Sequence, residues 1–318
     1  METIKKICIV VPCYNEEVIL RHSAELLLAK LDSLLEQKLI LPESFLLFVD
    51  DGSRDRTWEI ISQLKIEHPV QVSGLKLAAN RGHQNALLAG LLNAKDHADA
   101  AISIDADLQD DIDVIDQFIQ EFYQGNDIVY GVRSDRTSDS FFKRFTAESF
   151  YKLMEFLGVK TVYNHADFRL MSQRSLRALA EYQEVNVYLR GMVPLLGYRQ
   201  SIVLYKRKKA DRPTKYSLGK MLFLAWDGIT SFSVRPIRLI SLLGIVTLLF
   251  CMLMLLRIMY VKFFGYTVDG WTSIVALMLL FGGIQLLSIG VIGEYIAKTY
   301  VEVKHRPRFN IETDLQEK

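Results

Sequence analysis

The chain has 318 residues and a formal net charge of +1 at pH 7, and half of its residues are hydrophobic. This length is enough for one large domain or two with a sizeable core, and the near-neutral charge gives no indication of a nucleic-acid partner. Three scattered cysteines, Cys8, Cys13 and Cys251, exclude a disulfide framework and a cysteine metal site, which is typical of a reducing compartment.

The N-terminal residues run directly into an apolar segment, Ile7–Val11, which stops at Pro12. No hydrophobic region of a signal peptide precedes this segment. We therefore expect the first 200 residues to stay in the cytoplasm.

Short apolar runs alternate with segments of helical spacing through residue 132, which predicts strands alternating with helices. The predicted strands are Ile7–Val11, Ser44–Val49, Val70–Leu77, 100–105 and Asp127–Val132. The predicted helices are 14–37, Arg56–Ile66, Asn80–Lys95 and Ile112–Tyr123. This order indicates an α/β domain with an open, Rossmann-like, mostly parallel sheet.

Polar segments follow three of these strands, namely Pro12–Glu16, Asp50–Ser53 and Asp105–Asp107. Ligands of open α/β sheets bind beyond the carboxyl ends of the strands, so we expect a binding site at this edge. The chain has neither G-x-G-x-x-G after the first strand nor G-x-x-x-x-G-K-[ST], so a Rossmann dinucleotide site or a P-loop is not supported.

Asp105 and Asp107 form an Asp-x-Asp motif at the end of a predicted strand. Hard cations such as Mg²⁺ take oxygen ligands and share them with substrate phosphates. Alone, the motif also fits the acidic first turn of a helix, but the neighbouring polar loops favour a metal-diphosphate site. Arg133, at a neighbouring strand end, is a candidate contact for the same diphosphate. Asp110 and Asp111 are expected to be helix N-terminal acids.

Beyond residue 133, we expect a polar loop, a helix over Phe141–Leu157 and strands at Asp167–Met171 and Ser201–Tyr205. Between Arg199 and Lys220 there are eight Lys and Arg residues against one acid. A basic run of this kind is suited to anionic lipid headgroups. Residues 216–234 are expected to lie in the membrane interface as an amphipathic helix.

Two uncharged segments, Leu239–Leu256 and Trp271–Gly293, are long enough to span the roughly 20 residues of a hydrocarbon core. Basic residues flank the pair on its outer ends, which predicts that both termini are cytoplasmic. The expected division is a catalytic domain at 1–210, a basic juxtamembrane segment at 211–236, two transmembrane helices within 237–297 (about 239–260 and 271–296), and a cytoplasmic tail at 298–318.

The motifs together resemble family 2 glycosyltransferases of the GT-A fold. The segments that carry the resemblance are Val11–Glu17, Val49–Thr57, Asn80–Gly82 and Asp105–Gln109. The later segments Asp167–Met171 and Gly290–Tyr295 resemble the polyprenyl-phosphate branch, which includes bactoprenol glucosyltransferases and relatives of dolichyl-phosphate mannose synthase. The resemblance covers nearly the whole chain.

This resemblance implies a nucleotide-sugar donor, with UDP-glucose or UDP-GlcNAc favoured over GDP-mannose. It implies that the nucleoside is bordered by Pro12, Tyr14 and Glu16, with Asp50 on the base and Asp51 beside it. It further implies that Mg²⁺ or Mn²⁺ and the diphosphate are held by Asp105, Asp107 and Gln109. Tyr14 could instead be a core residue, and His83 and His165 are expected to be ordinary surface or packed residues.

The implied acceptor is undecaprenyl phosphate, delivered from the inner leaflet of the cell membrane. Candidate contacts to its phosphate are Arg133, Arg207, Arg212, Lys215 and Ser217. By resemblance, Asp167 matches an acidic position near the reaction centre, where it would act as a base or position the acceptor. The alternative is that Asp167 is a structural partner of Arg169. In-line attack would invert the anomeric carbon, giving a lipid-linked sugar for cell-envelope glycans. Homo-oligomers and a downstream flippase or glycosyltransferase are compatible partners.

Two alternatives remain open. A processive polysaccharide synthase would carry a Q-x-x-R-W signature, whereas the nearest stretch here is Tyr188–Met192, without the Gln and the Trp. A non-catalytic nucleotide-sugar-binding scaffold would be expected to lose the acidic residues, all of which are present. Transfer of labelled sugar to lipid separates the enzyme from the scaffold.

Overall fold

The computed structural model describes residues 4–134, 165–185, 187–206, 235–263 and 270–316. The chain divides into two compact units. One unit contains the β-sheet with its covering helices, and the other contains two long C-terminal helices.

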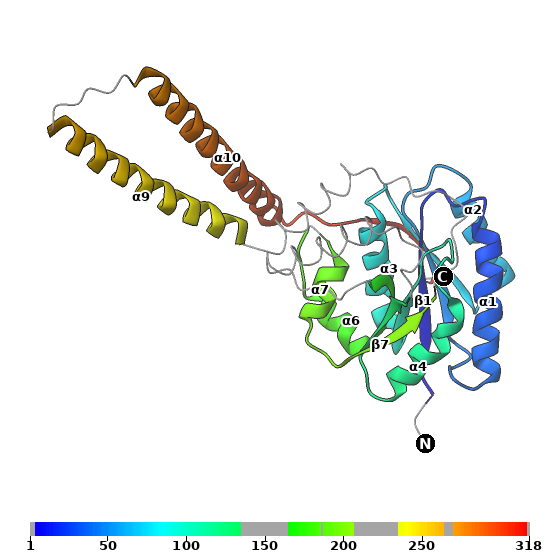
Figure 1. Ribbon diagram of the computed structural model, residues 1–318. Helices are drawn as coiled ribbons and strands as arrows, with labels where there is room; N and C mark the ends of the chain where they lie inside the picture. The colour runs from blue at the N-terminus through cyan, green and yellow to red at the C-terminus, as the bar shows by residue number, and fades with distance from the viewer. Residues whose placement is uncertain (1–3, 135–164, 186, 207–234, 264–269, 317–318) are drawn as a thin grey trace. The chain divides into compact units, whose positions relative to one another are not determined.

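The first unit is built on an eight-stranded sheet of order β7-β5-β6-β4-β1-β2-β3-β8. Figure 1 labels β1 and β7 among its strands. Its strands are β1 Ile7–Cys13, β2 Phe45–Asp50, β3 Val72–Leu77, β4 Ala100–Ser103, β5 Ile128–Arg133, β6 His165–Ser172, β7 Gln200–Tyr205 and β8 Ile311–Asp314. Four of the pairings are parallel, while β6 runs antiparallel to both β4 and β5, and β8 runs antiparallel to β3. The predicted α/β domain with a mostly parallel sheet is confirmed.

The helices of this unit are α1 Leu20–Glu36, α2 Thr57–Glu67, α3 His83–His97, the 3₁₀ turn η1 Ile112–Val114, α4 Ile115–Tyr123, α6 Gln173–Ala180 and α7 Leu189–Leu195. The helix predicted over 14–37 begins only at Leu20, and Val18, an apolar residue of the predicted range, is 83% exposed. The helix predicted from Ile112 starts as a 3₁₀ turn.

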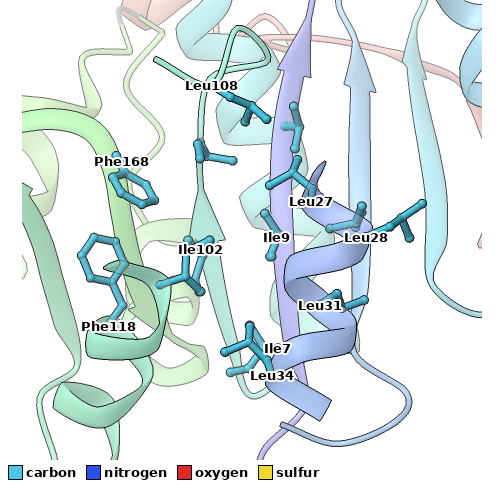
Figure 2. Packing of buried hydrophobic residues seen from close by; sticks show 14 of the residues in the cluster. Ile7, Ile9, Leu27, Leu28, Leu31, Leu34, Ile102, Leu108, Phe118 and Phe168 are labelled. Carbon is cyan, nitrogen blue, oxygen red and sulfur yellow. The ribbon is translucent and has the colours of Figure 1, made fainter. Parts of the chain in front are cut away.

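The hydrophobic core on one face of the sheet lies between the strands and the apolar sides of α1 and α4 (Figure 2). Leu27, Leu31 and Leu34 are spaced three to four residues apart on α1, so they share one helix face, and all three are fully buried. On the same face, the rings of Phe118 and Phe168 pack with centroids 4.7 Å apart.

Helix α3 covers the opposite face and approaches the sheet very closely at Gly90. A Cβ atom at this position would lie 2.4 Å from Cγ1 of Val10 and 2.7 Å from Cγ2 of Val49. Because both neighbours are branched side chains of buried strands, only glycine allows this helix–sheet distance. The first turn of α3, with His83 and Gln84, thereby reaches the carboxyl edge of the sheet.

The second unit contains α9, Arg235–Phe263, and α10, Trp271–Val303, close to where two helices were predicted. Among the described residues, one segment, Leu280–Val303 of α10, is long and apolar enough to cross a membrane. Within α9, the apolar stretch Leu242–Met254 is shorter. The two-span hairpin therefore stays a prediction. The helices predicted at 141–157 and 216–234 lie outside the described residues.

The C-terminal end differs from the expected tail at 298–318. Helix α10 continues to Val303, and Ile311–Asp314 then forms the edge strand β8 of the sheet. A four-residue strand with two acidic residues carries little apolar signal, so no pattern in the sequence indicated it.

Candidate functional site

Two loops after β1 and β2 are joined by hydrogen bonds into one platform. The backbone N–H of Asn15 donates to Oγ of Ser53 at 2.9 Å, and that of Arg54 donates to Oδ1 of Asn15 at 2.9 Å. The N–H of Glu16 donates to Oγ1 of Thr57 at 2.9 Å. Asn15 adopts a left-handed conformation with φ of 54°, which Asn tolerates better than most residues. These hydrogen bonds between the two loops therefore fix the platform.

The three residues expected to border a nucleoside lie on or beside this platform. Pro12 is buried in β1, Glu16 is half-buried, and Tyr14 is 42% exposed. The alternative that Tyr14 belongs to the core is therefore wrong. An exposed aromatic ring on a rigid loop is available to stack on a planar base.

Asp50, the last residue of β2, and Asp51, which follows it, have different hydrogen-bond partners. Both oxygens of Asp51 are occupied, because Oδ1 accepts from the N–H of Arg81 at 2.7 Å and Oδ2 from the N–H of Gly82 at 2.9 Å. Asp50 accepts from the N–H of Ser53 through Oδ1, while its buried Oδ2 has no hydrogen-bond partner within the described part of the chain. Burial raises the pKa of both carboxyls. Asp51 therefore holds the loop that contains Arg81 and Gly82, whereas Oδ2 of Asp50 can still accept a hydrogen bond.

The Asp-x-Asp motif follows β4 in a tight turn, where the N–H of Leu108 donates to the carbonyl of Asp105 at 3.2 Å. The amide Nε2 of Gln109 donates to Oδ2 of Asp107 at 2.6 Å. Burial, with added repulsion from neighbouring carboxylates, raises the pKa of Asp105, although His83 opposes this shift. The three predicted metal-binding residues are therefore brought together in one short turn.

Asp167 is the centre of a charged cluster on β6. Its Oδ1 accepts from Arg169 at 2.5 Å and from Nε of Arg190 at 3.2 Å, and its Oδ2 accepts from Arg190 and Gln84, each at 3.1 Å. Burial alone would raise the pKa of Asp167, but His83 and the two guanidinium groups hold it well below its usual range. An acid this firmly ionised and fully engaged is poorly suited to accept a proton in catalysis.

His83 links this cluster to the Asp-x-Asp turn. Its Nε2 lies 3.6 Å from Oδ1 of Asp105 and 3.6 Å from Oδ2 of Asp167. Burial lowers the pKa of His83, but the two carboxylates outweigh burial and raise it. His83, which was expected to be an ordinary surface or packed residue, thus lies between two carboxylates of the site. The side chain of Arg190 in the same cluster remains 41% exposed.

A second cluster joins the Asp-x-Asp turn to β5 and β7. The buried carboxylate of Asp110 accepts from the hydroxyl of Tyr205 at 2.6 Å and from Arg133 at 3.3 Å. Asp111 caps the turn η1 as expected, since its side chain accepts from the N–H of Asp113. For Asp110 the helix-terminus prediction is wrong, because its side chain points to these two partners. Arg133 lies at the predicted edge but is already engaged.

Sequence reasoning missed Gln84, Arg190 and Asp110 as members of the site. Gln84 and Arg190 follow no strand end and match no motif, so only tertiary packing, of α3 on β1 and β4 and of α7 on β6, brings them to Asp167. The acceptor-phosphate candidates in the basic segment, Arg207, Arg212, Lys215 and Ser217, lie outside the described residues.

The donor atoms of the Asp-x-Asp turn fit a hard divalent cation that binds together with a diphosphate. In the described ranges, no group of three His, Cys, Asp or Glu side chains is placed to hold a metal by itself. Mg²⁺ commonly takes one or two carboxylates and completes its shell with water and substrate phosphates. The carboxylates of Asp105 and Asp107 meet this requirement.

The chain is similar to known proteins over most of its length. The profile described as Glycosyl transferase family 2 matches residues 8–180. The YkoT protein of Bacillus subtilis, described as an uncharacterized glycosyltransferase, is 51% identical over 308 residues, which cover 96% of this chain and 91% of the relative. A protein of Shigella phage SfV described as a bactoprenol glucosyl transferase is 37% identical over 320 residues, covering 98% of this chain and 99% of the relative.

Among solved structures, a mannosyltransferase of Pyrobaculum calidifontis, PcManGT, in complex with GDP-Man and Mn²⁺ covers 96% of this chain and 86% of its own. The identity is 15% and the TM-score is 0.43.

Proposed function

Because the chain belongs to glycosyl transferase family 2, we propose that it transfers a hexosyl group from a nucleotide sugar to undecaprenyl phosphate. The observation that carries the proposal is the Asp105-x-Asp107 turn at a strand end, in a chain that aligns over nearly its full length with a bactoprenol glucosyl transferase. The donor is UDP-glucose or UDP-GlcNAc. The product is a lipid-linked sugar for cell-envelope glycans.

The nucleoside binds over the platform formed by the loops after β1 and β2. The exposed ring of Tyr14 stacks on the base, and Pro12 and Glu16 border it. Asp50 contacts the base with the oxygen that has no partner in the described structure. A buried acceptor without a partner is costly, so a donor N–H from a base would relieve that cost.

The diphosphate binds beside Asp105, Asp107 and Gln109. Mg²⁺ or Mn²⁺, held by these residues when bound, would neutralise the negative charge that develops on the leaving diphosphate. Arg190 lies in the adjoining cluster with its side chain partly exposed, so it adds positive charge on the same side.

The nucleophile is a phosphate oxygen of the acceptor. It forms a bond to the anomeric carbon while the bond from that carbon to the diphosphate breaks, and UDP leaves. The second pKa of a phosphomonoester is about 6, so this oxygen is largely ionised at neutral pH and needs no general base. Asp167 therefore acts as a positioning residue that orients Arg190. In-line attack inverts the anomeric configuration.

The C-terminal helices anchor the enzyme in the cell membrane, where its acceptor is found. The apolar segment Leu280–Val303 supports an anchor, and a second span with both termini cytoplasmic completes the proposed topology. The acceptor phosphate is met by cations of the basic segment, among them Arg207, Arg212 and Lys215, with Ser217 beside them. Self-association and a flippase or glycosyltransferase acting downstream fit this product.

The test is transfer of radiolabel to lipid. The purified full chain is incubated with Mg²⁺, undecaprenyl phosphate and one labelled donor at a time, namely UDP-glucose, UDP-GlcNAc or GDP-mannose. We expect label in the lipid fraction with one of the UDP sugars and none when undecaprenyl phosphate or the metal is left out. Absence of labelled lipid with every common nucleotide sugar would contradict the proposal.

A further inference from the structure

The C-terminal segment 308–316 has no part in the proposed chemistry, yet it is built into the sheet beside the donor loops. Strand β8 pairs with β3 so that Thr313 lies opposite Lys76. The ladder extends past both strands, because the N–H of Ala78 donates to the carbonyl of Asn310 at 2.9 Å. The segment therefore runs alongside β3 to the C-terminal end of that strand.

Side chains of this segment hold three different elements. Nδ2 of Asn93 on α3 donates to Oδ2 of Asp314 at 2.9 Å, and Glu312 forms an ion pair with Lys76 of β3 at 2.9 Å. Arg308 donates to the backbone carbonyl of Tyr182, which follows α6. Contacts to three elements fix the segment in one position.

The loop that begins at Ala78 reaches the carboxylate of Asp51. That carboxylate accepts the N–H groups of Arg81 and Gly82. Between Ala78 and Arg81, the loop passes so close to Gly52 that a Cβ atom on Gly52 would be 2.7 Å from the backbone of Ala79. The 78–82 loop is thus held at one end by the C-terminal segment and at the other by the end of β2.

We propose that residues 308–316 position the donor site, by holding the 78–82 loop against Asp51 and Gly52. This inference rests on the proposed function, in which the end of β2 faces the nucleoside. Without the segment, the first fixed point of the loop is lost, and the N–H groups that orient Asp51 become mobile. Nucleotide binding then weakens, while binding of the acceptor lipid is unaffected, because none of the proposed acceptor contacts belongs to residues 308–316.

The experiment compares the full chain with a variant that ends at Pro307. Binding of UDP is measured by calorimetry, and KM is measured separately for the UDP sugar and for undecaprenyl phosphate. We expect the Kd for UDP and the donor KM to rise about tenfold, with the lipid KM unchanged. A synthetic peptide of residues 305–318, added in excess, should restore the affinity for UDP. Unchanged UDP affinity in the folded variant would overturn the proposal.

A matched control separates positioning from general loss of stability. Ser44→Ala removes the hydrogen bond from the N–H of Ile7 at the opposite end of the sheet. We expect it to lower Tm without changing the Kd for UDP, and an equal loss of affinity in this variant would contradict the inference. Should the shortened chain not fold, the double variant Glu312→Ala, Asp314→Ala replaces it, with the same expected rise in Kd.

Hydrogen exchange makes the outcome independent of the proposed function. In the shortened chain, the amides of Arg81 and Gly82 should exchange faster than in the full chain, and the peptide should restore their protection. Unchanged exchange at these amides would overturn the positioning role. If the full chain neither binds UDP nor transfers sugar, the proposed function fails, and the exchange result still decides whether the C-terminal segment holds the loop.

Discussion

The two halves of the carboxyl edge of the sheet are held together by different forces. Beside β1 and β2, backbone N–H groups bind neutral side chains and the carboxylate of Asp51. Beside β4, β5 and β6, ion pairs predominate, and Asp110 accepts from two side chains and Asp167 from three. The first half leaves one oxygen of Asp50 without a hydrogen-bond partner among the described residues, whereas in the second half Asp105 lies beside His83 and Asp107 accepts from Gln109. This contrast predicts different results when acids of the two halves are changed.

The largest effect is expected for Asp107→Asn, on the charged half. Loss of one negative ligand weakens the metal-diphosphate contact, so kcat/KM should fall about 10³-fold while Tm stays unchanged. Transfer of label to lipid measures this. Asp111→Asn is the control, because Asn also caps a helical turn, and it should retain normal activity. Near-normal turnover in Asp107→Asn would remove the metal hypothesis.

Asp167→Asn is expected to affect stability as well as activity. It leaves the buried Arg169 without its counter-ion, which costs about 3 kcal/mol of unfolding free energy. Chemical denaturation measures the change, and the exposed Asp96→Asn should stay within about 0.5 kcal/mol of the parent. A fully stable Asp167→Asn protein would show that the cluster contributes no net stability.

On the hydrogen-bonded half, Asp51→Asn tests the platform. An amide has a single acceptor oxygen for the two N–H groups of Arg81 and Gly82, so one donor is left unpaired at a cost of about 1–3 kcal/mol. We expect a higher donor KM with little change in kcat. Asp32→Asn, which alters an exposed contact to Gln71, serves as the reference. A lower kcat at unchanged KM would place Asp51 in the chemistry instead.

Tyr14→Ala should have a smaller effect, limited to nucleoside binding. Loss of stacking by an exposed ring weakens UDP binding by about 1 kcal/mol and leaves Tm unchanged. Calorimetry with UDP measures this, and Tyr14→Phe, which keeps the ring, should bind normally. Equal losses in both variants would assign the effect to the hydroxyl.

The smallest effect concerns Asp127, at the other end of β5. Burial opposes ionisation, but Arg174 and Ser172 lower the pKa of this carboxyl. The pKa of Asp127 in the folded protein thus lies below the unfolded value of about 3.9. The ionised carboxylate therefore stabilises the folded protein above about pH 3.9, and this stabilisation is lost as the pH falls through the folded pKa. The drop in Tm between pH 7 and pH 3.5 should be slightly smaller in Asp127→Asn. An unchanged drop would contradict this.

The parts of the fold that depend on local pattern were predictable from sequence. Apolar runs located β1 to β7, and the polar residues after β1, β2 and β4 indicated the functional edge. The antiparallel direction of β6 was not predictable, because an apolar run does not encode its direction. The partners of Asp167 were equally inaccessible, since Gln84 and Arg190 lie 83 and 23 residues away along the chain and meet Asp167 only through tertiary packing.

Asp110 illustrates a further limit. In sequence it is one of four neighbouring acids, and an acid ahead of a helix is ordinarily explained by the helix dipole. In the structure, Asp110 is buried and accepts a hydrogen bond from the hydroxyl of Tyr205, which lies 95 residues away in the sequence.

The close approach at Gly90 also has a consequence for how the sequence can vary. His83 and Gln84 reach Asp167 from the first turn of α3, while the distance of that helix from the sheet depends on the missing side chain two turns later. Even a methyl group at residue 90 must push the helix outward or displace Val10 and Val49. In a library of all single substitutions, position 90 should therefore be as intolerant as the charged residues themselves, although it lies outside the site and carries no functional group.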